Sequence, residues 1–179
     1  IISFEGTLNA EFQPSGVKAS AWDVKTLSLI ESTASEPGMN EQGSIKPKEL
    51  PSMLSQSDIH MISPTPMTSV ALKKWADGIL LRKRLNAFKG TVYYFGNALA
   101  KTGSIIEIKG VGKKLSGQAF VSAVSHTIDS GVWNTSVSFG LENKLIAESP
   151  GFSYPGANGQ LPEMHGLQLA TVIKIDQDP

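Results

Sequence analysis

The sequence of 179 residues contains no cysteine, which excludes disulfide bonds, cysteine-based zinc sites, iron–sulfur clusters and a thiol nucleophile. Charged residues are also scarce at 18%, and 16 basic side chains balance 16 acidic ones. Because the net charge is zero, no overall field attracts nucleic acid or anionic lipid, so a polyanion-binding function is disfavoured. No apolar run approaches the roughly eighteen residues that a membrane-spanning helix needs.

The two ends of the sequence predict a fragment of a longer protein. It begins Ile1-Ile2-Ser3-Phe4-Glu5, without an initiator methionine and without the basic start of a signal peptide. It ends at Pro179, soon after a run over 167–175 whose alternation is typical of a β-strand. We therefore expect the chain to continue in the intact protein.

The first 66 residues combine β-type runs with a long irregular stretch. Residues 1–8 alternate weakly, and after a turn signal at 14–16, Val17, Ala19 and Ala21 share one parity while Trp22 takes the other. Five prolines and many serines then occupy residues 31–66. This composition predicts a long loop with little regular structure.

The clearest helix is predicted over residues 68–88. An apolar stripe follows the spacing i, i+3, i+4, i+7 and i+8 and consists of Leu72, Trp75, Ala76, Ile79 and Leu80. Thr68 or Ser69 provides an N-cap, and Gly90 is the expected stop. The spacing therefore predicts one prominent amphipathic helix.

Beyond Gly90 the period changes to two. Runs at 91–95, 104–109, 118–128 and 132–141 are separated by turns that each contain glycine. In the last run one face is shared by Trp133, Thr135, Val137, Phe139 and Leu141, so one side of the sheet is predicted to be core. These runs predict an antiparallel meander, which makes residues 1–148 a mainly β domain.

The C-terminal part predicts a linker followed by a second domain. Prolines and glycines are too frequent in residues 149–166 for a helix or strand. Regular alternation returns at Leu167, so residues 167–179 are predicted to hold the first strand of a truncated domain.

Catalytic and metal-binding motifs are missing from the sequence. His60, His126 and His165 lack the spacing that places two histidines on one helical face. Ser122 and Asp129 lie near His126, but no G-x-S-x-G elbow accompanies them. The glycines at 110–112 predict a hairpin turn and not a phosphate loop. We therefore expect no enzymatic activity, no cofactor and no metal.

Charge is concentrated on the predicted helix, where residues 68–89 hold six basic side chains and one acidic one. The candidate assembly contacts are Lys73, Lys74, Arg82, Lys83 and Arg84. Such a cluster is either an ordinary solvated face or a surface that docks an acidic ring or a neighbouring subunit.

The order of these features resembles a known family. The segments Val17-Lys18-Ala19-Ser20-Ala21-Trp22-Asp23, Gly90-Thr91-Val92, Ile105-Ile106-Glu107-Ile108 and Gly117-Gln118-Ala119-Phe120-Val121 follow one another around the helix. This arrangement is similar to the spike proteins of contractile injection machines: the valine-glycine repeat (VgrG, Rhs element Vgr) proteins of type VI secretion and the phage late-control D and baseplate hub proteins. The segment from Pro162 to Val172 resembles the entry into the family's OB-fold.

The resemblance implies a β-barrel hub domain over residues 1–148 and the start of an OB-fold at 167–179. It also implies a homotrimeric ring that caps a hexameric Hcp-like tube and carries a needle, with a PAAR-type tip or effector beyond it. Such a protein assembles in the bacterial cytoplasm and is then injected or secreted, crossing a membrane only by mechanical puncture.

Two other functions remain open at this stage. A carbohydrate-binding adhesion module needs exposed aromatic residues on one face, and Tyr93, Tyr94 and Trp133 are the candidates. Alternation places Tyr93 and Tyr94 on opposite faces. A hydrolase lacks any matched pair of catalytic groups.

Overall fold

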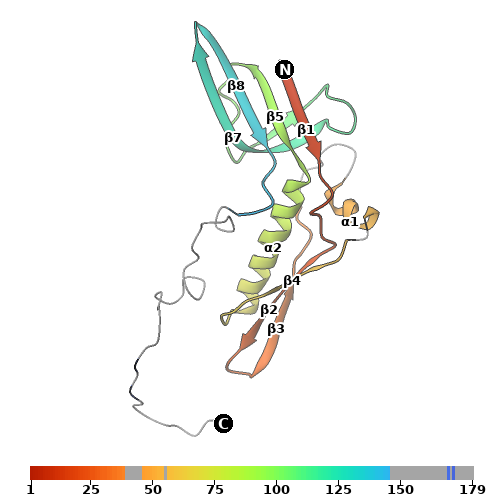
Figure 1. Cartoon of the computed structure of the whole chain (residues 1–179), viewed down its shortest axis with the longest axis vertical. Coiled ribbons are helices and arrows are strands. Elements are labelled where there is room, and N and C mark those ends of the chain that lie inside the picture. The colour runs from red at the N-terminus through yellow and green to blue at the C-terminus, as the bar shows by residue number, and fades with distance from the viewer. Residues whose placement is uncertain (39–45, 55, 146–168, 170, 172–179) are drawn as a thin grey trace.

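The computed structural model describes residues 1–38, 46–54, 56–145, 169 and 171. A five-stranded sheet lies at one end and a three-stranded sheet at the other, with helix α2 running between them (Figure 1). The strands are β1 (Ser3–Leu8), β2 (Val17–Asp23), β3 (Ser28–Thr33), β4 (Ile59–Ile62), β5 (Phe88–Phe95), β6 (Ile105–Ile108), β7 (Gly117–Asp129) and β8 (Val132–Phe139). The helices are η1 (Pro47–Glu49), α1 (Leu50–Met53) and α2 (Ser69–Asn86).

The five-stranded sheet is antiparallel, has the order β1-β5-β8-β7-β6 and is curled into a half-barrel. Its concave face is filled by Phe88, Val92, Ala119 and Phe139, all buried. The rings of Phe88 and Phe139 lie 4.9 Å apart. The predicted core face of residues 132–141 is confirmed for Thr135, Val137 and Phe139, which are buried, whereas Trp133 is 39% exposed and Leu141 lies beyond the end of β8.

The prediction of a simple meander was wrong in the order of the strands. Strands β6, β7 and β8 do follow one another, but β5 pairs with β8, and the N-terminal strand β1 pairs with β5. The turn between β7 and β8 is confirmed, since Ser130 and Gly131 both have positive φ angles, 49° and 78°. This combination is typical of a tight type I′ hairpin turn.

The three-stranded sheet has the order β3-β2-β4. Val17, Ala19 and Ala21 of β2 are fully buried against Leu72 and other residues of α2, which confirms the predicted parity. Part of the segment expected to be a loop is regular, because β4 pairs with β2 in parallel and η1 and α1 precede it. Alternate burial of β4 fits a strand with one face toward this core.

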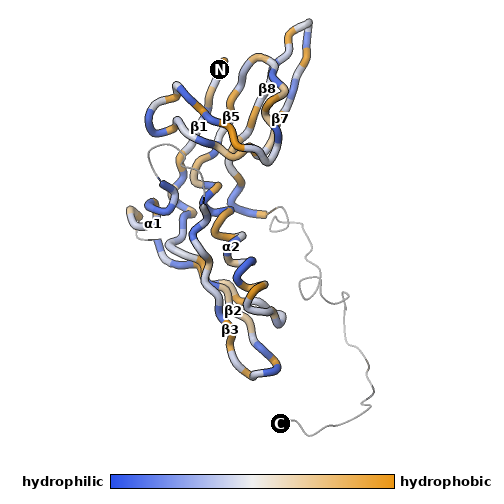
Figure 2. The backbone as a smooth tube through the Cα atoms, turned by 180° about the vertical axis from the view of Figure 1, so that it is seen from behind, coloured by the Kyte–Doolittle hydropathy of each residue, from blue (hydrophilic) through white to orange (hydrophobic). Residues whose placement is uncertain are grey.

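Helix α2 covers one face of this sheet, and its sequence combines apolar and polar residues along its length (Figure 2). The Thr68 hydroxyl caps it by accepting a hydrogen bond from the Ala71 amide at 3.2 Å. The helix ends at Asn86 and passes directly into β5. Gly90 is therefore not the helix stop: it pairs with Gly6 inside the sheet, where a Cβ atom would lie 1.9 Å from the Glu5 carbonyl oxygen.

The predicted linker over 149–166 lies outside the described residues, and so does nearly all of the predicted OB-fold strand over 167–179. Within the described part of the chain, no helix is both long enough and apolar enough to cross a membrane.

Candidate functional site: the basic residues of α2 and the adjoining groove

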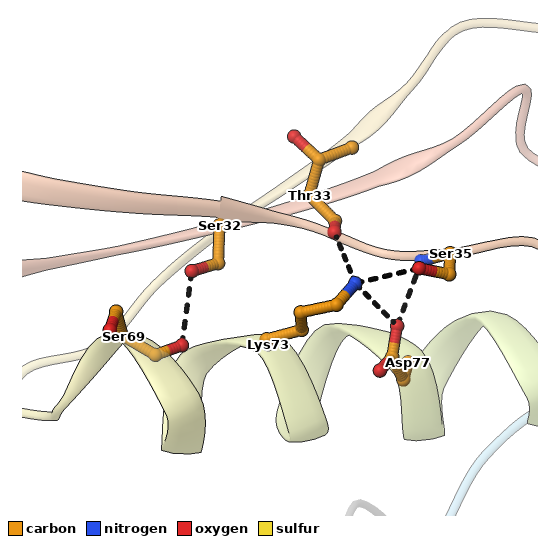
Figure 3. Close-up of polar contacts among 6 residues, drawn as sticks. All are labelled: Ser32, Thr33, Ser35, Ser69, Lys73 and Asp77. Carbon is orange, nitrogen blue, oxygen red and sulfur yellow. Dashed lines mark hydrogen bonds and ion pairs between the residues drawn. The ribbon is translucent and has the colours of Figure 1, made fainter.

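Lys73 is held in a local network that joins α2 to the end of β3 (Figure 3). Its ammonium group donates to the Thr33 carbonyl at 3.2 Å and the Ser35 hydroxyl at 2.7 Å, and lies 3.5 Å from the Asp77 carboxylate. The Ser35 amide donates to Asp77 at 2.8 Å. This hydrogen bond, followed by the charge of Lys73, lowers the pKa of Asp77 below its ordinary value. The charge of Lys73 is thus largely compensated within the chain.

Arg84 is an interior residue, which corrects its inclusion among the candidate docking contacts. Its side chain is only 1% exposed, and its guanidinium donates to both Glu36 carboxylate oxygens, at 2.7 and 3.0 Å. It also donates to the Pro14 carbonyl at 3.0 Å and the Gln13 side-chain oxygen at 3.3 Å. Because all of these partners belong to the same chain, Arg84 fastens the segments around residues 13 and 36 to the helix.

The other three basic residues remain partly or fully at the surface. The Lys74 side chain is exposed and forms no hydrogen bond in the part of the chain that the structure describes. Lys83 is half-buried, and its ammonium donates to the Asn143 side chain. Arg82 is half-buried and reaches the Lys144 carbonyl at 3.5 Å, a long and weak contact. Lys83 and Arg82 thus point to the segment 141–145 that follows β8.

A groove of about 920 Å³ lies beside this segment, between α2 and the outer surface of the five-stranded sheet. Three cationic side chains line it, Arg82, Lys89 and Lys144, together with the single carboxylate of Glu142. Lys89 contacts both Glu142 oxygens, at 3.1 and 3.0 Å. Gly140 allows the sharp turn of the backbone from β8 into the segment 141–145. Its φ of 80° favours glycine, and a Cβ there would lie 2.4 Å from the Phe88 carbonyl oxygen.

The floor of the groove carries hydroxyl groups from four strands, namely Thr7 of β1, Thr91 of β5, Ser122 of β7 and Ser138 of β8. Thr91 and Ser138 are direct cross-strand partners. Ser122 lies where the β7–β8 register shifts, so this irregularity brings its side chain to the groove. Basic residues of α2 were predicted from sequence, but Lys144 and the hydroxyl groups were not.

The candidate catalytic residues are not assembled into a triad. The His126 ring lies 2.9 Å from the Thr135 hydroxyl and edge-on to Trp133, with ring centroids 5.6 Å apart. Ser122 instead lines the groove. His60 is exposed on β4, and His165 lies outside the described residues. Among the residues that are described, no three histidine or carboxylate groups are placed to share a metal ion.

The aromatic candidates for carbohydrate binding do not form one exposed cluster. Tyr94 packs against the concave core, where burial raises its pKa above the ordinary 10.0, and Tyr93 faces the opposite side of β5. Trp133 is 39% exposed and lies over Gly96, where an added Cβ would be 2.1 Å from the indole. The three side chains therefore offer no flat platform for a sugar.

The architecture is shared with phage tail proteins. The structure matches the 43 kDa tail protein of prophage MuSo2 from Shewanella oneidensis with a TM-score of 0.50 and 10% identity, over 79% of this chain and 38% of the other. It matches a tail protein from Neisseria meningitidis MC58 with a TM-score of 0.51 and 14% identity, over 78% of this chain and 39% of the other. At such low identity the likeness defines the fold alone, and this chain spans less than two fifths of either protein.

The family is defined by sequence. The Alg8 N-terminal domain family matches residues 1–130, and the chain belongs to that family. No curated protein sequence matches the chain. The expected phage-tail type of fold is confirmed, whereas the narrower assignment to the VgrG spike proteins stays a prediction.

Proposed function

We propose that this chain is a structural part of a contractile, phage-tail-like injection machine, in which it forms a subunit of the hub that joins tube and spike. The observation that carries the proposal is the fold shared with two phage tail proteins over more than three quarters of the chain. Its role in such a machine is mechanical: repeated contacts between identical subunits hold the hub together while force passes through it.

The finer form of the proposal is a homotrimeric ring that caps a hexameric Hcp-like tube and carries a needle of the VgrG type. The ring assembles in the bacterial cytoplasm and leaves the cell when the machine fires. The exposed cations of α2 and the groove support this form, because they provide a surface for an acidic neighbour.

Light scattering of the intact protein, extended through the domain that follows Pro179, tests the proposal. We expect a mass three times that of one subunit, and co-purification with a coexpressed Hcp-like tube protein. A monomer at high concentration that also fails to retain the tube protein would refute the hub function.

A further inference from the structure

The groove between α2 and the five-stranded sheet holds positive charge that the described residues do not neutralise. Lys89 and Glu142 already form an ion pair within it. Within the described residues the Arg82 side chain forms one hydrogen bond, at 3.5 Å to a neutral carbonyl, and Lys144 is exposed. Two cations at one rim of the groove therefore lack a carboxylate partner among the described residues, and both prefer an anionic ligand.

The floor of the groove adds hydrogen-bonding capacity that is also unused. The hydroxyls of Thr7, Thr91, Ser122 and Ser138 form no side-chain hydrogen bond in the described part of the chain. Each hydroxyl can donate one hydrogen bond and accept others. Because they come from four different strands, they are spread across the sheet and do not converge on one point.

This distribution favours an extended ligand over a compact anion. The groove meets the C-terminal end of α2, where the Asn86 side chain donates to the Leu141 carbonyl at 2.8 Å. A helix C-terminus carries partial negative charge, which disfavours the concentrated charge of a phosphate. Separate carboxylates along a chain can instead approach Arg82 and Lys144 individually while intervening groups bond the hydroxyls.

We propose that this groove binds an acidic, extended segment of another protein chain. Arg82 and Lys144 bind its carboxylates, and the row of hydroxyls bonds its polar groups. The inference rests on the proposed function in one respect, since a hub subunit must contact neighbouring proteins. It adds the site and the chemistry of the bound segment.

The test measures binding of a fluorescein-labelled decapeptide of alternating glutamate and serine to the intact protein by fluorescence anisotropy. The comparison variant is R82E/K144E, and the matched control is K48E/K113E, which makes the same change in net charge at exposed lysines outside the groove and outside α2. We expect the groove variant to bind at least tenfold more weakly and the control to stay within about threefold of the unaltered protein. A peptide with glutamine in place of glutamate should not bind.

Equal binding by the groove variant and the control would overturn the proposal, and so would equal binding of the glutamine peptide. Displacement of the peptide by low millimolar inorganic phosphate would also overturn it, because the site would then prefer compact anions. If R82E/K144E does not fold, T91V/S138A keeps the charges and should still weaken binding severalfold; unchanged binding there would refute the hydroxyl contribution.

Light scattering separates this inference from the proposed function. If the unaltered protein is monomeric and retains no tube protein but binds the peptide through the groove, the hub function fails and the groove assignment stands. If it is trimeric and the peptide binds equally to both variants, the groove assignment fails and the hub function stands.

Discussion

Replacing Arg84 by methionine should cost the protein about 3 kcal/mol of unfolding free energy, with most of the loss arising from two buried acceptors. Arg84 is 1% exposed, and the Pro14 carbonyl and the fully buried Gln13 both accept hydrogen bonds from it. Each acceptor left without a donor costs about 1 to 3 kcal/mol. Methionine retains much of the apolar packing, so no large cavity term is added.

The ion pair itself contributes less to this total. The Glu36 side chain is 41% exposed, so its carboxylate regains water when the guanidinium is removed. A partly exposed pair is worth about 0.5 kcal/mol after solvent screening. Glu36→Gln should accordingly cost about 1 kcal/mol, since the guanidinium keeps its neutral partners.

Urea unfolding followed by tryptophan fluorescence and far-ultraviolet circular dichroism provides the measurement. Arg82→Met is the matched control: in the part of the chain that the structure describes, the Arg82 side chain forms only the 3.5 Å hydrogen bond, and we expect a change below about 0.5 kcal/mol. A loss of unfolding free energy below about 1 kcal/mol for Arg84→Met, or one no larger than for Arg82→Met, would refute the assignment. Arg84 would then not be a buried residue that stabilises the contact between α2 and the segments around residues 13 and 36.

Three further predictions concern other parts of the fold. Asp77→Asn should lower the melting temperature at pH 7, and this loss should shrink as the pH is lowered below 3.8, because the folded-state pKa of Asp77 is lowered and its contribution is present above the unfolded value and lost as pH falls through the folded one. A loss that stays constant with falling pH would contradict the Ser35 hydrogen bond as its source. Absorbance titration at 295 nm should show Tyr94 ionising above pH 10, and Tyr94→Phe should remove that component. Gly96→Ala should destabilise the protein by about 2 kcal/mol and shift the tryptophan emission, since the new methyl group overlaps Trp133; unchanged emission would contradict their contact.

The elements that could be predicted from the sequence are those whose apolar residues recur with a regular period along the whole element. The alternation of Val17, Ala19 and Ala21 located β2, and the apolar spacing located α2 to within two residues at its C-terminal end. Strand β4 was missed because it has only four residues and lies among prolines. Its parallel partner is about 40 residues away, and a short run contains no information about such a partner.

The sequence does contain an indication that Arg84 is buried. Leu72, Ala76 and Leu80 form the buried stripe, and Arg84 is the next residue at the same spacing of four. A charge on that stripe predicts a buried, paired side chain. The sequence contains no comparable indication of the groove. The floor of the groove forms only because β5 lies beside β8 and β1 lies beside β5, and these pairings join strands that are distant in the sequence.

The pairing of β1 with β5 has a consequence for synthesis of the protein. Ser3 pairs with Tyr93, so β1 leaves the ribosome some 90 residues ahead of β5, its neighbour among the described strands. At about 5 to 20 residues per second this delay is on the order of 5 to 18 seconds. Throughout it the backbone of β1 and the apolar side chains of Ile1, Ile2 and Phe4 lack their folded-state neighbours, so this strand is open to pairing with other chains until β5 has been made.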